Sequence, residues 1–221
     1  MFELTDANSY LGHFLFTNGL MPLLKAAADT GSDVRILTIA SNAVAVFLPS
    51  KYKPDFTDPQ FYRGVVPPPP FSLRLTMYFL GEGDYLRYAV SKLATMMFAS
   101  ELQRRLTDAE SPILSIAINP GAVDSNGTAP SMLKPWLRPM LKGITISEDE
   151  GSWNALFMGT AKEIRENEAV WKGRYVEPVG QLDDGHALMR DEEQRRLLWD
   201  ATTSEINQYL QEQGRPLLEE W

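Results

Sequence analysis

The chain has 221 residues, 44% of them hydrophobic and 23% charged, which is the composition of an ordinary globular protein. A formal net charge of −8 argues against nucleic-acid binding, because neutralising phosphates requires clustered Lys and Arg. Cysteine is absent, the two histidines are too few for a histidine-based metal site, and no apolar run is long enough to predict a membrane span. We therefore expect a soluble, cytoplasmic protein with no metal site.

The first part of the chain predicts a helix, a strand and a long loop. Apolar residues recur at helical spacing over residues 11–28, and Pro22 inside this segment predicts a kink or a broken turn. Residues 34–40 are β-branched and apolar, which is typical of a buried parallel strand. Residues 42–83 are rich in proline and aromatic residues, and a loop of this length in a compact domain is more often functional than inert.

The rest of the chain continues the alternation of helices and strands. We predict a helix over residues 83–106, a strand over 113–118, a strand over 173–178 and a charged terminal helix over 190–212. Alternation of this kind predicts an α/β fold, a parallel sheet with right-handed crossovers and helices on both faces. Neither an internal repeat nor a break in composition divides the sequence, so residues 1–221 form one predicted domain.

A further helix is predicted to begin at Ser147. Glu150 follows three residues later, and together the two residues form the signature of a capping box. The apolar residues Trp153, Leu156 and Phe157 are expected to point from this helix into the core.

The pentapeptide from Tyr88 to Lys92 carries the clearest chemical signal. Residues four apart on a helix project from the same face. An isolated tyrosine keeps its proton until about pH 10, and a nearby ammonium group lowers that pKa. The pair therefore suits transfer of one proton to or from a carbonyl or alcohol oxygen. The alternative is that the two side chains only pack on a helix surface.

Two more segments are placed at the carboxyl ends of predicted strands. Ser41 follows the first strand, and Asn119-Pro120-Gly121 follows the second. Open α/β sheets bind ligands at this edge, so the Ser41 hydroxyl is a candidate donor to a substrate oxygen. The alternatives are a hydroxyl that caps local backbone at Ser41 and a plain turn at Pro120 and Gly121.

These segments together resemble the short-chain dehydrogenase/reductase family, in particular its fungal, retinol-dehydrogenase-like branch. Beyond the order of Ser41, Tyr88, Lys92 and Pro120, the similar stretches are residues 11–17, 91–94, 98–102, 173–178 and 198–199. The resemblance implies that Tyr88 is the general acid/base, that Lys92 lowers its pKa, and that Ser41 orients the substrate oxygen. It implies a Rossmann-type, doubly wound sheet, here a partial one.

The implied cofactor is NADP(H), with its nicotinamide end held by Tyr88, Lys92, Pro120, Gly121 and Val123. The family places a glycine-rich turn between its first strand and helix to receive the pyrophosphate. None of the 15 glycines forms that pattern, so the chain resembles the catalytic half of the family without its N-terminal dinucleotide-binding half. By this comparison the chain is N-terminally truncated, as a partial gene product would be.

Two further departures concern the active site. The position of the family's catalytic Asn holds Ser9, with Asn8 one residue earlier. The span from Ser41 to Tyr88 is long for the family, so residues 42–83 are predicted to form an enlarged substrate loop.

The missing half has a physical consequence for the sheet. The strand at residues 34–40 would lose its neighbour and become an exposed apolar edge, which is a hazard for unwanted pairing. We therefore expect a homodimer, or a partner chain that covers this edge. The family commonly dimerises through the helices represented here by residues 11–28 and 83–106.

Three interpretations of function stay open. The first is an oxidoreductase that uses NADP(H) on a ketone or alcohol of an apolar small molecule, in fungal secondary metabolism. The second is a cofactor-free isomerase, dehydratase or cyclase that uses Tyr88 and Lys92. The third is a truncated remnant without catalytic activity.

Overall fold

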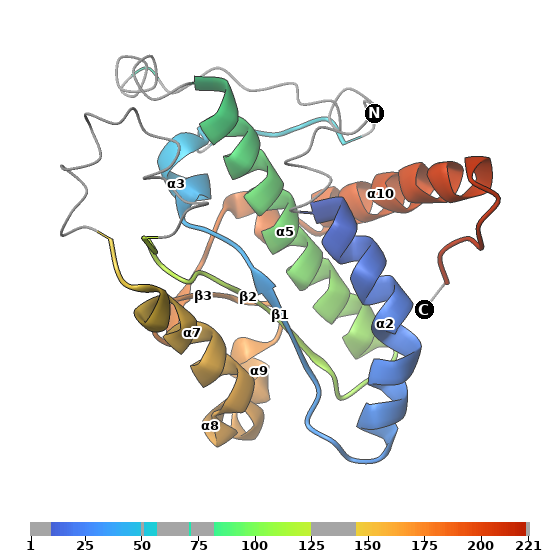
Figure 1. The fold of residues 1–221 in the computed structure, drawn as a ribbon, viewed down its shortest axis with the longest axis horizontal. Helices are drawn as coiled ribbons and strands as arrows, with labels where there is room; N and C mark the ends of the chain where they lie inside the picture. Colours follow the sequence, from blue (N-terminus) through green and yellow to red (C-terminus); the bar gives the residue numbers. More distant parts are fainter. Residues whose placement is uncertain (1–9, 50, 57–70, 72–81, 125–144, 220–221) are drawn as a thin grey trace.

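The computed structural model describes residues 10–49, 51–56, 71, 82–124 and 145–219 (Figure 1). The long helices and the strands begin and end within a few residues of the predicted bounds. The elements in chain order are α2 (Gly12–Asp29), β1 (Arg35–Ile39), α3 (Ala43–Phe47), α5 (Glu82–Asp108), β2 (Leu114–Ile118), α7 (Glu148–Thr160), α8 (Lys162–Glu166), α9 (Glu168–Trp171), β3 (Tyr175–Glu177), β4 (Gln181–Asp183), the 3₁₀ helix η5 (Ala187–Met189) and α10 (Glu192–Glu212).

One sheet with the strand order β1-β2-β3-β4 forms the centre of the described structure. β1 pairs with β2 in parallel, and β2 pairs with β3 in parallel. The predicted parallel sheet is therefore confirmed for these three strands. β4 was not predicted, and it pairs antiparallel with β3 through a tight hairpin. All three residues of β4 are exposed, so this strand has no apolar pattern in the sequence.

Helices cover both faces of the sheet, as predicted. β2 is buried along its whole length, and its side chains alternate between two clusters. Leu114, Ile116 and Ile118 pack with Met158 of α7 and Ile164 of α8. The opposite face carries the larger cluster, which includes side chains of α2, α5 and α10. Figure 1 shows the two helical layers on either side of the strands.

Helix α2 runs without interruption from Gly12 to Asp29 and contains Pro22. Of the two predicted outcomes, a kink or a broken turn, the structure therefore excludes the broken turn. Buried residues anchor the helix on both sides of the proline, with Phe14 and Met21 before it and Ala28 after it. Packing of these turns onto the core outweighs the hydrogen bond that a proline removes.

Helix α7 begins with the predicted capping box, in which the Ser147 side chain accepts from the Glu150 backbone N–H. The predicted inward face is wrong for two of its three residues. Trp153 and Leu156 are 54% and 57% exposed. Phe157 is half-buried and packs on the smaller cluster.

The face of α7 that the core does bury is set by a close contact at Gly151. A Cβ added there would stand 2.3 Å from Cγ2 of Val123, so only glycine allows this approach. Asn154 and Met158 follow Gly151 on the same side of the helix, and both are fully buried. The pattern of apolar residues in the sequence therefore indicated the wrong face of α7 as the buried one.

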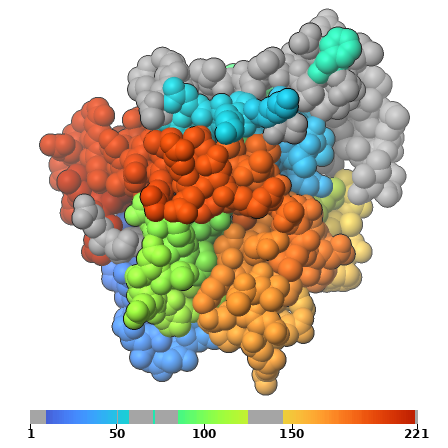
Figure 2. Space-filling view, turned by 180° about the vertical axis from the view of Figure 1, so that it is seen from behind, coloured from blue at the N-terminus to red at the C-terminus, as the bar shows by residue number. Residues whose placement is uncertain are grey.

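Helix α5 is enclosed within the single chain. All its described side chains from residue 85 to residue 103 are buried or half-buried. Seen from behind in Figure 2, the red α10 lies against the green surface of α5. The helix pair expected at a dimer interface is thus not exposed as a pair, because α10 covers α5. Among the described side chains of the two helices, the exposed large apolar ones are Leu15, Phe16 and Leu23 of α2.

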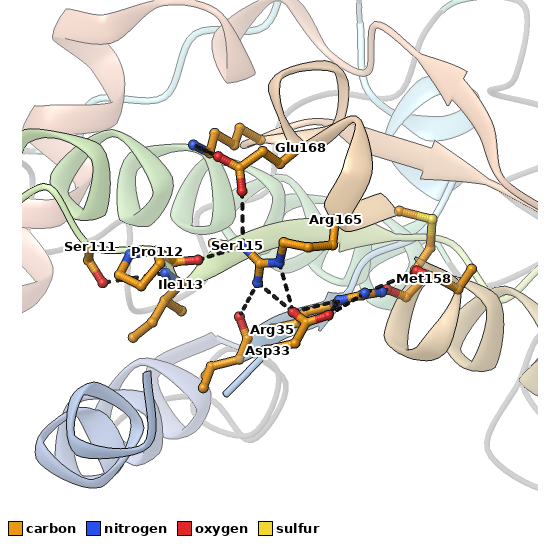
Figure 3. Close-up of polar contacts among 12 residues, drawn as sticks. Asp33, Arg35, Ser111, Pro112, Ile113, Ser115, Met158, Arg165 and Glu168 are labelled. Carbon is orange, nitrogen blue, oxygen red and sulfur yellow. Dashed lines mark hydrogen bonds and ion pairs between the residues drawn. The ribbon is translucent and has the colours of Figure 1, made fainter. Parts of the chain in front are cut away.

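An ionic cluster closes the end of the sheet where β1 begins (Figure 3). Asp33 accepts hydrogen bonds from Arg35 and from Arg165 of α8. Arg35 also donates to the carbonyl of Met158 at 2.8 Å, and Arg165 donates to the carbonyl of Pro112 at 2.7 Å. These bonds tie the starts of β1 and β2 to α7 and α8, at the opposite end of the sheet from Ser41.

The expected enlarged loop falls mostly outside the described residues. Of residues 42–83, the structure describes 42–49, 51–56, Phe71 and the first two residues of α5. They include the short helix α3, which the sequence did not predict and which packs against α5. Ser9 also lies outside the described residues. Among the described helices none is both long and apolar enough to cross a bilayer.

Candidate active site

The predicted site residues gather at the carboxyl edge of the sheet. β1 ends at Ile39, two residues before Ser41, and β2 ends at Ile118, directly before Asn119. β3 ends at Glu177, beside them in the sheet order. Parallel strands bring their carboxyl ends to one edge, where open α/β sheets bind their ligands. The fold therefore brings together the segments that the sequence singled out.

Tyr88 and Lys92 lie one turn apart on α5, as their spacing predicted. The Lys92 Nζ atom lies 5.6 Å from the centroid of the Tyr88 ring. Tyr88 is half-buried, whereas Lys92 is only 9% exposed. The pair therefore lies close enough for the two side chains to act on one bound oxygen or ribose, and the Tyr88 hydroxyl is a group that can transfer a proton.

The Lys92 ammonium group also reaches the edge of the sheet. Its Nζ donates to the carbonyl of Ile39 at 2.9 Å. The N–H of Ala40 donates to Ile118, so in this parallel ladder the Ile39 carbonyl points away from β2, toward the open side of β1. Burial lowers the pKa of Lys92, because desolvation penalises the charged ammonium form.

Ser41 is half-buried at the turn between β1 and α3. Its Oγ accepts a hydrogen bond from the Ala43 backbone N–H at 3.2 Å. The local capping that the sequence allowed is therefore present. Because this bond uses a lone pair, the hydroxyl proton can still be donated to a substrate oxygen.

The turn after β2 is fixed by the Asn119 side chain. Its Oδ1 accepts from the Gly121 N–H at 3.1 Å, and Gly121 has a φ of +91°, which favours glycine. After the turn, Val123 forms a β-bridge with Ile146, in which the Asp124 N–H donates to the Ile146 carbonyl and the Ile146 N–H donates to the Ala122 carbonyl. The positions of Gly121 and Val123 are thus set by the backbone of the fold.

Two residues that the sequence interpretation missed hold this turn to β3. Glu177 accepts from Asn119 Nδ2 through Oε2 at 2.6 Å and from the Tyr175 hydroxyl through Oε1 at 2.7 Å. Asn154 of α7 is fully buried and donates to the carbonyls of Asn119 and Val176, at 2.7 and 3.1 Å. The position at a strand end was the available signal for Glu177, whereas the sequence offered none for Asn154, because the apolar pattern of α7 indicated another face of the helix as buried.

A cavity of about 370 Å³ lies beside these residues. Its walls come from α3, from Met96 of α5, from Tyr175 and Glu177 of β3, and from the segment after β4. The volume is in the range of pockets that hold small molecules. The cavity opens between elements that all meet at the carboxyl edge of the sheet.

The described residues fit one end of a nicotinamide dinucleotide. The ammonium of Lys92 and the phenol of Tyr88 are suitable donors to ribose hydroxyls, and the turn at Gly121 supplies backbone beside them. In the described part of the chain, no turn after β1, β2 or β3 joins a glycine-rich loop to a helix N-terminus, where a pyrophosphate is normally held. The fit therefore covers the nicotinamide–ribose end alone.

Comparisons with known proteins identify the family. No family model matches the chain. A short chain dehydrogenase/reductase, dpchH, of Colletotrichum higginsianum is 35% identical over 209 residues, which cover 93% of this chain and 49% of the relative. A second, dpfgH, of Gibberella zeae is 33% identical and covers 82% of this chain and 49% of the relative.

The chain belongs to the short-chain dehydrogenase/reductase family. Mouse polyprenol dehydrogenase is also similar, at 30% identity over 86% of this chain and 50% of the relative. A solved structure of an uncharacterised protein from Mycobacterium paratuberculosis shares the fold, with a TM-score of 0.55 and 22% identity over 92% of this chain and 58% of that chain.

The chain spans about half the length of the short-chain dehydrogenases/reductases that it matches. Within that half it contains the Tyr88-to-Lys92 pentapeptide, Ser41 and the turn after β2 at one edge of the sheet. The remaining half of each relative lies outside the matched region.

Proposed function

We propose that this chain is the catalytic half of an oxidoreductase that acts on a ketone or alcohol of an apolar small molecule with NADP(H), in fungal secondary metabolism. The observation that carries the proposal is the Lys92 ammonium 5.6 Å from the Tyr88 ring, at the sheet edge that also holds Ser41. The printed names of the relatives support an oxidoreductase, and several of those relatives are fungal.

Each proposed role follows from the chemistry of the side chain. The Tyr88 hydroxyl passes a proton to the carbonyl oxygen in reduction and takes it back in oxidation. Lys92 makes this transfer easier by stabilising the phenolate. Ser41 donates its hydroxyl proton to the same oxygen and fixes its position. When bound, NADP(H) supplies the hydride, and Tyr88, Lys92, Pro120, Gly121 and Val123 would hold its nicotinamide–ribose end.

The proposal includes a partner at the open edge of β1. In the described residues no strand pairs with the outer edge of β1. An edge strand presents outward carbonyl and N–H groups that can pair with another strand, although Lys92 already holds the Ile39 carbonyl. The matched relatives are about twice as long as this chain. We therefore propose that a second polypeptide segment or a second chain pairs here and supplies the pyrophosphate-binding turn that the described residues lack.

Calorimetric titration with NADPH and NADH tests cofactor binding by the purified 221-residue chain, after a cooperative melt is confirmed. Micromolar binding would mean that a second copy of the chain completes the dinucleotide site, and Lys92→Met should then weaken this binding about tenfold, because a donor to the ribose is lost. Lys162→Met on α8 is the matched control and should leave binding unchanged. A folded chain that binds neither cofactor contradicts a self-sufficient reductase and favours the cofactor-free or partner-completed interpretations.

A reductase assay then tests Tyr88 itself. Tyr88→Phe is expected to lower kcat by about 10² to 10⁴, because the proton donor is lost while the ring and Lys92 remain. Cofactor affinity in the same variant should stay close to that of the wild type. Tyr209→Phe, at an exposed position on α10, is the control. Equal activity of Tyr88→Phe and the wild type would rule out general acid/base catalysis by Tyr88.

A further inference from the structure

The 370 Å³ cavity is lined by residues that follow the proposed catalytic residues closely in the chain, although Ser41, Tyr88 and Lys92 do not themselves line it. Asn42 lines it and directly follows Ser41. Met96 lines it from α5, four residues after Lys92 and therefore on the same face of the helix. The cavity therefore lies beside the elements that carry the proposed catalytic residues.

Most of the cavity wall is apolar. Val44 and Leu48 come from α3 and the residue after it, and Met96 comes from α5. These three side chains are at most 4% exposed, so they form a fixed wall of the core. An apolar substrate body would contact them and leave water, which is the usual source of affinity in small-molecule pockets.

One end of the cavity is acidic. The Glu177 carboxylate is half-buried and is held by two neutral donors, the Tyr175 hydroxyl and the Asn119 amide. Asp183 lines the same end, and its Oδ1 accepts from the Gly185 N–H. Within the described residues no Lys or Arg forms an ion pair with Glu177 or Asp183. Their negative charges therefore remain available to act on a ligand.

The titration of neighbouring groups agrees with a negative environment. Burial raises the pKa of Tyr175 far above its ordinary value, and the charges of Glu177 and Asp183 raise it further. His186 lines the cavity but does not offset these charges, because burial lowers its pKa and keeps it neutral at neutral pH. The nearby Arg190 is 3.8 Å from the exposed Asp184, outside the cavity lining.

We propose that this cavity binds the apolar body of a neutral, hydroxyl-bearing substrate and rejects substrates that carry a carboxylate or phosphate. Glu177 and Asp183 accept hydrogen bonds from hydroxyl groups and repel anions. This inference rests on the proposed function in one respect, because it assigns the cavity to the substrate. The binding preference itself requires no cofactor.

Two probes of the same shape test the inference by calorimetric or fluorescence titration of the 221-residue chain. They are 2-naphthalenemethanol, which is neutral, and 2-naphthoate, which is anionic at neutral pH. We expect the alcohol to bind at least about tenfold more tightly than the carboxylate, because the half-buried Glu177 carboxylate repels an anion strongly and the exposed Asp183 adds to this repulsion. Val44→Trp should abolish binding of the alcohol, since the larger side chain fills the cavity.

Variants without the two negative charges test whether the preference for the alcohol comes from charge repulsion or from the shape of the cavity. The double variant Glu177→Gln with Asp183→Asn should reduce the preference to less than about threefold by strengthening carboxylate binding. Asp184→Asn is the matched control, because this neighbouring carboxylate is ion-paired with Arg174 and lies outside the lining. Melting curves confirm that each variant is folded.

The inference is overturned by equal binding of both probes to the wild type, by an unchanged preference in the double variant, or by a folded chain that binds neither probe. Binding of the alcohol that persists in Val44→Trp would also overturn it, because the probe would then occupy another site. Failure of the NADPH titration would count against the proposed function alone, since neither naphthyl probe needs a dinucleotide.

Discussion

Asp33 shows how a single carboxylate holds the end of the sheet far from the proposed site. Hydrogen bonds from Arg35, followed by those from Arg165, lower its pKa from 3.8 to about 2 (Figure 3). A carboxyl group with a depressed pKa in the folded state stabilises the fold above its unfolded pKa, and this contribution is lost as the pH falls toward 2. The Asp33 side chain is 41% exposed, so solvent screening reduces the effect.

We predict that Asp33→Asn lowers the free energy of unfolding by about 1 kcal/mol at neutral pH, after allowance for screening. The difference from the wild type should shrink as the pH falls from about 4 to 2, because wild-type Asp33 becomes protonated. Urea denaturation at several pH values measures both effects. Asp29→Asn, at an exposed position on α2, is the control, and a difference that does not depend on pH would contradict the prediction.

Asn154, also a single residue, joins three segments at the site. It donates to the carbonyls that end β2 and β3, and its Oδ1 accepts from the Gly180 N–H of the β3–β4 hairpin at 3.1 Å. A buried amide with all these bonds fixes the relative position of two strand ends. The turn proposed to line the nicotinamide is therefore supported from α7, a helix on the other face of the sheet from α5.

Among the elements, α10 determines how much of the catalytic helix is exposed. The Trp199 ring stacks on Phe98 of α5 with centroids 5.7 Å apart, and the Arg105 guanidinium lies 4.5 Å above Trp199. Glu101 of α5 is 1% exposed and pairs with Arg104 and Arg105 beside this contact. Such an interface combines apolar burial with charge pairing, so α10 is a fixed part of the fold.

We predict that Trp199→Ala lowers the free energy of unfolding by about 3 to 5 kcal/mol, because it leaves a cavity between α10 and α5. Tyr209→Ala on the same helix is the matched control, since Tyr209 is 50% exposed, and its cost should stay near or below about 1 kcal/mol. Urea denaturation compares the two variants. Similar losses in both would show that α10 contributes little through its packing on α5.

At the scale of the whole molecule, β1 is an edge strand of the described sheet, with no strand paired to its outer side among the described residues. A groove of about 260 Å³ runs between this strand and α2, lined by apolar residues that include Phe16, Leu20 and Leu37. Ile39 on the strand is 43% exposed. Lys92 occupies the carbonyl of Ile39 and places a charge at one end of the edge, which is a known means of limiting strand addition.

We predict that the isolated chain self-associates through this edge and that Ile39→Lys reduces the association, because a charged side chain opposes edge-to-edge pairing. Analytical ultracentrifugation over a range of concentrations measures the effect. Leu156→Lys is the control, at an exposed apolar residue of α7 away from the edge. An equal response of the two variants, or a strictly monomeric wild type, would contradict the prediction.

The sequence predicted the long elements and the proposed catalytic residues because both depend on local spacing. The helix around Pro22 shows a helical apolar period, the buried strands are short apolar runs, and Tyr88 and Lys92 share a helix face by their separation alone. The hairpin of β4 and the short helix α3 escaped prediction. Both are too short, and β4 too exposed, to leave a periodic apolar signal.

The sequence by itself determined the family, the α/β class and the candidate residues at strand ends, because each of these can be inferred from short segments of neighbouring residues. Only the tertiary structure decided that α7 buries Asn154 instead of Trp153, that α10 covers α5, and that Glu177 holds Asn119. Those contacts join residues far apart in the chain, such as Asn119 and Glu177, 58 positions apart. Packing and hydrogen bonding across such separations depend on the positions of whole elements, which local patterns do not encode.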